Sequence, residues 1–399
     1  MTTRPAVAPA PAEQNLGRAL WLLVAASTLC FLPFGAYAAT VPRWLDSDLG
    51  AGPALIGFLM ASLSVAAVLS RPLAGRFSDL RGRRLAAVIG AVLSALGALL
   101  LLFPPVTGVV ALARATVGIG EALVTTACMA WIVDAIPAAR RGWAMSWFGM
   151  SVWFGMSLGP QAGELARDLG GFDLVWALAA ISTLLAAGLL AAVPDSSIDV
   201  AGERSAFRVP KAVLVPGVAM GLAVFGEGVL IAFGVQHLVQ RGVQDGAGIG
   251  GAASVYSVLA AGALVSRPFI ASLPDKLGGR MCGMLGTVLV GVGLAGLAVA
   301  SSFGAAAIAA VSMGCGLALL YPSLSLLVAA DVRPDQRGVA MGAFTAFVDV
   351  GIGVGAIVGG LVVAAVSTAA AFWAGSAAAL LGCLLLLIRL PGVGPRVPA

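Results

Sequence analysis

The sequence predicts an all-α integral membrane protein with twelve transmembrane helices in two pseudo-symmetric six-helix bundles. Three observations predict this class: an apolar composition, a series of apolar segments of spanning length, and a set of motifs that occurs twice. Of the 399 residues, 60% are hydrophobic and 10% are charged, whereas a soluble domain carries about 25% charged residues. So few charges cannot cover a water-facing surface, and the 53 glycines suit membrane helices, where glycine is frequent.

The apolar segments follow one another along the whole chain. A helix needs about 20 apolar residues to cross a hydrocarbon layer of roughly 30 Å. We expect spans over residues 18–41, 54–75, 84–103, 107–134, 142–163, 174–194, 212–236, 249–270, 281–301, 305–330, 338–364 and 369–389. The first segment also resembles a secretory signal peptide, since Ala36-Tyr37-Ala38 follows it. The repeat described below requires this segment, so we interpret it as a retained helix.

The basic residues of the loops predict the orientation, because cytoplasmic loops carry an excess of Lys and Arg. The loops on the side of the termini contain Arg76, Arg81, Arg83, Arg84, Arg140, Arg141, Arg204, Arg208, Lys211, Lys276, Arg280, Arg333, Arg337, Arg389 and Arg396. The opposite loops contain only Arg43, Arg167 and Arg241, beside several aspartates. We therefore expect both termini in the cytoplasm. The net charge of +5 is then explained by topology and does not indicate nucleic-acid binding.

The expected organisation is two bundles with short polar segments around them. It comprises a disordered tail over 1–15, a bundle over 16–194, a linker over 195–211, a bundle over 212–390 and a tail over 391–399. The linker is too short to form a folded domain. The abundance of Ala, Gly and Arg beside two lysines suggests a bacterial chain, and we expect a monomer in the plasma (inner) membrane, surrounded by the lipid bilayer.

A set of motifs occurs twice at one fixed spacing. Ser70-Arg71-Pro72 recurs 196 residues later as Ser266-Arg267-Pro268. At the same spacing, the matching pairs are Asp79 and Asp275, Gly82 and Gly278, Arg84 and Arg280, Arg141 and Arg337, Phe148 and Phe344, and the glycines 155, 159 and 163 with 351, 355 and 359. Chance does not produce three separate blocks in one register. The chain therefore consists of two parallel copies of a six-helix unit.

The segment Gly75-Arg76-Phe77-Ser78-Asp79-Leu80-Arg81-Gly82-Arg83-Arg84 resembles the loop signature between helices two and three of the major facilitator superfamily. In that family two six-helix halves rock about a site near the bilayer midplane. The resemblance implies that Asp79 caps a helix or pairs across the interface between the halves, and that Arg83 and Arg84 lie on the cytoplasmic face. An ordinary basic loop would explain the arginines but not the repeated Asp-x-x-Gly spacing. We assign a gating role to Arg71, Gly75, Asp79, Gly82, Arg83 and Arg84, and to Arg267 and Asp275 in the second copy.

The fifth span contains Gly155, Gly159, Pro160 and Gly163, which resemble the glycine-rich signature of drug:proton antiporters in the same superfamily. Glycines four residues apart let a neighbouring helix approach closely, and the proline loosens its helix. Such a face suits halves that rock, so these four residues are candidates for conformational change. The alternative is a generic small-residue packing face. Glu164 stands where the family pattern has a further glycine.

Four ionisable residues are candidates for proton coupling: Arg114, Glu121, Glu227 and Asp349. Arg114 and Glu121 are seven residues apart, so they lie on one face of the fourth span, about 10 Å apart. A charge at mid-membrane costs about 3 kcal/mol and persists mainly where it faces water, a partner or a substrate. The alternatives are a structural Arg114–Glu121 pair, and a structural partner role for Asp349 at the interface between the halves. A carboxyl group in an apolar surrounding can bind and release protons as a cavity alternates.

Phe34, Tyr37 and Tyr321 are candidates for contacts with substrate, although aromatic residues in membrane helices commonly serve packing alone. Pro33 and Gly35 are expected to break the first helix near its middle. We expect proton-coupled efflux of small amphipathic compounds by alternating access. The alternative from the same fold is a proton symporter that imports a nutrient or metabolite, and a more remote alternative is a receptor or an intramembrane enzyme.

Several other function classes are excluded by what the sequence lacks. There is one histidine, and the five cysteines show no CxxC spacing, so no metal site is expected. The same residues offer no catalytic constellation, which argues against an enzyme. No phosphate-binding GxxxxGK[ST] loop occurs. The expected energy source is therefore the proton gradient, without a cofactor.

Overall fold

The computed structural model describes residues 11–193, 210–246, 248, 250–270, 272–333 and 336–389. The helices are α1 (Pro11–Ser47), α2 (Pro53–Arg81), α3 (Arg83–Leu100), α4 (Thr107–Ala135), α5 (Ala138–Ala191), α6 (Leu214–Gln240), α7 (Ser254–Ile270), α8 (Leu273–Leu277), α9 (Gly279–Val299), α10 (Phe303–Asp331), α11 (Arg337–Ala365) and α12 (Thr368–Arg389), with a 3-10 turn η1 (Lys211–Val213) before α6. The described residues contain no β-strand. The predicted C-terminal tail, most of the predicted linker and the first ten residues of the predicted N-terminal tail lie outside the described residues, and α1 already begins at Pro11.

The helices account for the twelve predicted spans. Ten helices in the described part of the chain are long and apolar enough to cross a membrane. One of them, α5, is two spans, because Gly170 and Gly171 have non-helical backbone angles, and the φ of 70° at Gly171 is one that favours glycine. The shorter apolar helix α7 supplies the remaining span.

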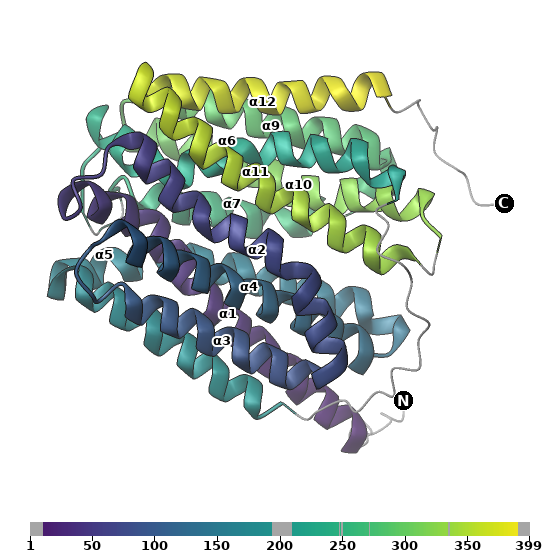
Figure 1. The fold of residues 1–399 in the computed structure, drawn as a ribbon. Coiled ribbons are helices and arrows are strands. Elements are labelled where there is room, and N and C mark those ends of the chain that lie inside the picture. Colours follow the sequence, from purple (N-terminus) through teal and green to yellow (C-terminus); the bar gives the residue numbers. More distant parts are fainter. Residues whose placement is uncertain are drawn as a thin grey trace, which may run out of the picture.

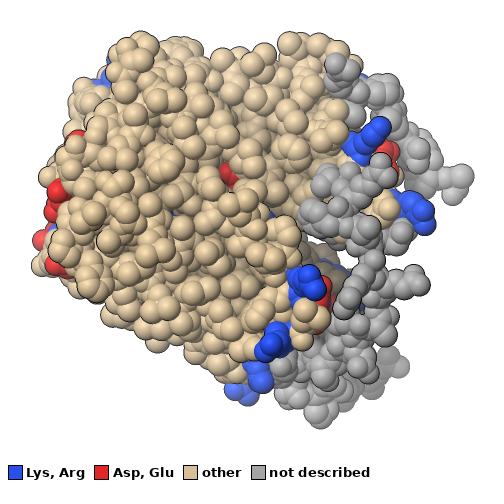
Figure 2. Space-filling view, in the orientation of Figure 1, with Lys and Arg blue, Asp and Glu red and all other residues tan. Residues whose placement is uncertain are grey.

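The two ends of the helices differ in charge (Figure 2), with most of the visible Lys and Arg at one side of the view and most of the visible Asp and Glu at the other. We call the first the basic end, which carries Arg76, Arg81, Arg84, Arg140, Arg141 and Arg280. We call the second the acidic end, which carries Asp46, Asp48, Asp168, Asp173 and Asp245. Helix α1 begins at the basic end and α12 ends there as well (Figure 1), as an even number of spans requires.

The repeat is visible in the packing of the two halves, α1–α5 and α6–α12, which lie side by side (Figure 1). A Cβ atom placed on Gly90 would lie 2.6 Å from the carbonyl oxygen of Gly120, which brings α3 against α4. The equivalent pair in the second half, Gly286 and Gly316, brings α9 against α10 in the same way, with a distance of 3.0 Å. Each half therefore packs by the same glycine contacts, because glycine alone permits such close backbone approach.

Two seams join the halves, α2 against α11 and α5 against α7. Polar contacts also join the halves toward the acidic end. The Arg43 guanidinium at the end of α1 lies 2.5 Å from the carboxylate of Asp245, which follows α6. Gln161 of α5 donates a hydrogen bond of 2.8 Å to the hydroxyl of Ser254 at the start of α7. The halves are thus held together at the acidic end.

The first helix differs from the prediction. The expected break at Pro33 and Gly35 is wrong, because α1 continues as a helix through this region to Ser47. A proline inside a helix removes one backbone hydrogen bond and does not have to end the helix. Gly35 instead serves close packing, since a Cβ atom there would lie 2.6 Å from the carbonyl oxygen of Met156 in α5.

Candidate functional site

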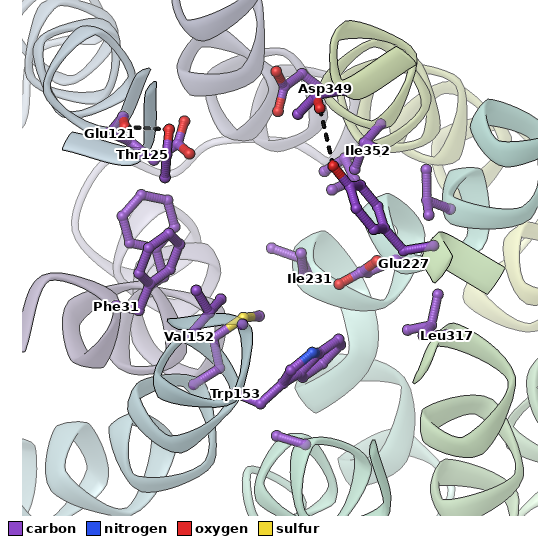
Figure 3. Close-up of a pocket in the computed structure, with 18 of the residues that line it drawn as sticks. Phe31, Glu121, Thr125, Val152, Trp153, Glu227, Ile231, Leu317, Asp349 and Ile352 are labelled. Atoms are coloured by element: carbon purple, nitrogen blue, oxygen red, sulfur yellow. Dashed lines mark hydrogen bonds between the residues drawn. The ribbon is translucent and has the colours of Figure 1, made fainter. Parts of the chain in front are cut away.

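A cavity of about 790 Å³ lies between the two halves. Its lining comes from α1, α2, α4 and α5 of the first half and from α6, α7, α10 and α11 of the second. Figure 3 shows Phe31, Val152 and Trp153 facing Ile231 and Leu317 across this space. Ligand pockets for small molecules commonly measure about 300–1,000 Å³, so the cavity has room for one small organic compound.

The cavity is open toward the basic end. Ser146, Pro268 and Pro322 line it at that side and are exposed. Tyr37 and Tyr256 line it toward the acidic end and are buried, with exposed fractions of 2% and 7%. The contacts between the halves at the acidic end therefore close the cavity on one side, while the other side admits solvent.

Most of the lining is apolar or aromatic. The three aromatic residues predicted from the sequence, Phe34, Tyr37 and Tyr321, all line the cavity. Sequence reasoning missed Trp153 and Tyr256, which also line it. An apolar membrane helix has no polar face to distinguish its lipid side from its cavity side, so no sequence signal marks these two residues.

Arg71 connects three helices inside the cavity. Its guanidinium lies 2.5 Å from the Asp349 carboxylate of α11 and 3.4 Å from the Glu121 carboxylate of α4. It also lies 3.4 Å from the hydroxyl of Thr125. The three charged side chains are 10–14% exposed. One cation thus serves two carboxylates, one in each half, and Asp349 has the partner role at the interface that the sequence left open.

Arg114 and Glu121 do not pair in this structure. Arg114 instead donates a hydrogen bond of 3.1 Å to the carbonyl oxygen of Met60 in α2. Its guanidinium also lies 5.9 Å from the ring centre of Tyr37, a distance at which a cation is attracted to the aromatic face. Both Arg114 and Glu121 line the cavity, as their shared helical face predicts. The structural Arg114–Glu121 pair is therefore wrong, because each side chain has other partners within reach.

Glu227 projects from α6 into the cavity (Figure 3). The glycines on either side of it let α6 pack closely against two neighbours: Gly226 against Leu294 of α9, and Gly228 against α11 near Ala356. The side chain between them is directed inward and is 9% exposed. No cation within the described residues forms a salt bridge with Glu227. It is thus a carboxyl group without an ionic partner on an apolar wall.

The loop signature lies at the basic end and acts within one half. Arg83 forms a salt bridge with Asp79 and a second one, of 3.0 Å, with Asp134 of α4. Gly82 supplies the turn between α2 and α3, with a φ of 96°. In this structure the salt bridge of Asp79 joins α2 to α3 within the first half, and the implied roles of Asp79 in capping and in pairing across the halves stay predictions. The cavity opens toward this end.

The other residues of the two loop copies also lie toward the basic end. Gly75 is in α2 and half-buried, and Arg84 is exposed in the first turn of α3. In the second copy, Asp275 is exposed in the short helix α8. Arg267 of α7 lines the cavity and lies against α5, where a guanidinium nitrogen is 3.4 Å from the carbonyl oxygen of Ser146. Their gating roles stay predictions.

The glycine-rich face of α5 packs against α1 of the same half. A Cβ atom on Gly159 would lie 2.7 Å from the Cα atom of Gly35, and one on Gly163 would lie 2.9 Å from the Cβ atom of Ala36. Gly155 lies against α1 in the same way, and the Pro160 ring is beside Gly35. The sequence suggested that this face suits a seam between the rocking halves. In the structure it packs within the first half and is not part of that seam. Any role in conformational change acts through the position of α1.

Glu164, which departs from that signature, is fully buried and pairs with two arginines, Arg43 of α1 and Arg167. Arg43 in turn binds Asp245 of the other half. The glutamate thus holds the arginine that closes the acidic end.

Comparison with known proteins agrees with this architecture. A family model described as the Major Facilitator Superfamily matches residues 23–238 and 217–399. The chain belongs to the major facilitator superfamily. An uncharacterised MFS-type transporter of Salmonella typhimurium is 28% identical over 391 residues, which cover 96% of this chain and 99% of that protein. A second, from Burkholderia mallei, is 29% identical over 393 residues and 93% of each chain.

Solved structures show the same fold. The nucleoside transporter NupG superposes with a TM-score of 0.74 at 17% identity, covering 92% of this chain and 99% of that one. A peptide transporter POT superposes with a TM-score of 0.78 at 16% identity, covering 95% and 98%. The chain is therefore a multi-pass membrane transporter of the major facilitator type and not an enzyme, as the sequence predicted.

Proposed function

We propose that this transporter exports small amphipathic compounds in exchange for protons, by alternating access. The observation that carries the proposal is Glu227, a carboxyl group without an ionic partner among the described residues, on the apolar wall of a cavity that opens at one end. A buried charge without a partner is costly. Glu227 can avoid that cost by binding a proton or by receiving a positively polarised group of the compound.

These two ways of neutralising Glu227 exclude each other, and that exclusion would produce exchange. A compound that enters the cavity displaces the proton, and a proton that binds releases the compound. The aromatic side chains of Phe34, Tyr37 and Tyr321 line the same space and would bury the apolar part of the compound. The resemblance of the fifth span to the drug:proton antiporter signature supports the same direction.

The sidedness of the proposal follows from charge. The basic end is the cytoplasmic end under the rule that positive loops remain inside, which puts both termini in the cytoplasm of a bacterial plasma membrane. The cavity then faces the cytoplasm, where a compound for export is collected. To release it, the contacts of Arg43 and Gln161 at the acidic end would separate and the basic end would close.

Arg71, Glu121 and Asp349, together called the Arg71 cluster, supply a link between protonation and the position of the halves. Arg71 shares its charge between Glu121 of its own half and Asp349 of the other. Neutralising either carboxylate would leave Arg71 with the remaining one, and so would change how firmly α2 is bound to α11. We assign Glu227 to the exchange of proton and compound, and the Arg71 cluster to communication between the halves. The protein acts as a monomer, with the proton gradient as its energy source and no cofactor.

The direction of coupling is tested in proteoliposomes that contain the purified protein and an interior pH dye, during addition of a varied panel of amphipathic compounds. A compound that drives protons opposite to its own movement supports antiport. Protons that move with the compound would replace antiport by symport, the function of an importer. Protein-free liposomes give the background for compounds that cross the bilayer unaided.

A further inference from the structure

The two halves place an arginine at equivalent positions, Arg71 in α2 and Arg267 in α7, 196 residues apart. Both side chains line the cavity, and each contacts the other half across one of the two seams. Arg71 reaches α11 through Asp349, and Arg267 reaches α5 at Ser146. The repeat has thus kept the cation in both copies.

The repeat has not kept the acids. At the same spacing, the counterpart of Glu121 is Leu317 and the counterpart of Asp349 is Trp153. Both counterparts line the cavity, and Figure 3 shows both facing its open space. The two positions that carry carboxylates beside Arg71 thus carry apolar side chains in the other copy of the repeat.

Arg267 consequently has no ionic partner among the described residues. The hydrogen bond that its guanidinium makes is the one of 3.4 Å to the carbonyl oxygen of Ser146. The position next to it on α5 is Gly149, where a Cβ atom would lie 2.9 Å from a guanidinium nitrogen. The absence of a side chain there leaves the guanidinium open to the cavity. A guanidinium binds carboxylate and phosphate groups with two parallel hydrogen bonds.

We propose that Arg267 binds an anionic group of the transported compound, a carboxylate, sulfonate or phosphate, while the apolar body of the compound contacts Trp153 and Leu317. The ligand supplies the acid that the second copy of the repeat lacks. This inference rests on the proposed function in that the cavity is the substrate site, but it does not depend on the direction of transport. Together with the role proposed for Glu227, it defines the substrate as an amphipathic compound that carries an acidic group for Arg267 and a positively polarised group for Glu227.

The test compares three probes with one ring system: 1-naphthoate, 1-naphthylmethylammonium and neutral 1-naphthalenemethanol. Binding to the purified protein in detergent is measured by equilibrium dialysis, with protein-free micelles as the blank. We expect naphthoate to bind more tightly than naphthalenemethanol by about 10- to 100-fold, the range for a hydrogen bond to a charged group. Arg267→Gln removes that preference and Arg267→Lys keeps part of it. Arg76→Gln, which removes an exposed arginine at the basic end, leaves the preference unchanged.

Three results would overturn the proposal. They are equal affinity for the three probes, no binding of the anion, and a preference for naphthoate that survives in Arg267→Gln. An anionic lipid headgroup has the same chemistry, so the titration is repeated in nanodiscs of phosphatidylcholine with and without phosphatidylglycerol. Loss of naphthoate binding with phosphatidylglycerol alone would assign Arg267 to lipid. Because no proton gradient is present, a failure of proton coupling does not affect this measurement.

Discussion

The guanidinium of Arg71 lies 2.5 Å from the carboxylate of Asp349, and this ion pair joins α2 of the first half to α11 of the second in the interior of the transporter. The same guanidinium lies 3.4 Å from Glu121 of its own half. A single cation therefore lies between two acids that would otherwise repel each other in an apolar surrounding. This geometry predicts how strongly substitution of each of these three residues destabilises the protein.

Arg71→Gln is expected to destabilise the protein most, then Asp349→Asn, then Glu121→Gln. Loss of the arginine leaves two carboxylates unpaired, and removal of one partner from a buried pair costs about 3 kcal/mol or more. Loss of Asp349 leaves Arg71 paired with Glu121, and loss of Glu121 removes only the longer contact. Thermal unfolding midpoints in detergent measure the order. If Glu121→Gln lowered the unfolding midpoint as much as Arg71→Gln, the result would contradict the shared-cation arrangement.

A cross-link at the acidic end is expected to stop transport. Gln161 and Ser254 lie on opposite halves and share a hydrogen bond of 2.8 Å, so cysteines at both positions are within reach of a short thiol-reactive cross-linker. Alternating access requires these residues to separate. We expect transport to fall to background after cross-linking and to return with a reducing agent. The single variants Gln161→Cys and Ser254→Cys, treated identically, control for the native cysteines, and full activity of the cross-linked protein would exclude opening at this end.

Gly159→Val is expected to destabilise the first half. A Cβ atom at Gly159 would lie 2.7 Å from the Cα atom of Gly35 and 2.8 Å from the amide nitrogen of Ala36, so α1 and α5 must move apart, at a typical cost of about 1–3 kcal/mol. Gly188→Ala is the matched control in α5, because no atom lies within 4 Å of its added Cβ. Alanine there is expected to raise stability slightly, since it favours helix more than glycine does. Equal effects of the two substitutions on the unfolding midpoint would argue against the close α1–α5 contact.

The fold could be predicted from the sequence because its signals are long-range and redundant. Spans of about 20 apolar residues have one stable solution in a bilayer, and motifs repeated at 196 residues fix the two-fold arrangement of six-helix units. The acidic residues of the cavity could also be predicted, since an ionisable residue in a membrane helix faces a cavity or a partner, whereas the sequence predicts Arg71 and Arg267 only as gating residues. Glu121, Glu227 and Asp349 all line the cavity.

The partners of these residues could not be predicted, because partners are set by helix packing and not by spacing along one helix. Arg114 and Glu121 share a helical face, yet Arg114 donates a hydrogen bond to the carbonyl oxygen of Met60 and Glu121 lies beside Arg71. The glycine face of α5 could not be assigned to a neighbour either, since small residues permit close approach of any helix.

The exchange of proton and compound at Glu227 is tested most directly by Glu227→Gln in proteoliposomes with an interior pH dye. The wild-type protein is expected to move protons against the compound. The variant is expected to exchange labelled compound down its gradient and to move no protons, because glutamine occupies the same space but cannot release a proton. Asp46→Asn, at an exposed acid of the acidic end, is expected to behave as wild type. Full proton movement in Glu227→Gln, with loss of it in Glu121→Gln or Asp349→Asn, would contradict the assignment and place proton exchange at the Arg71 cluster.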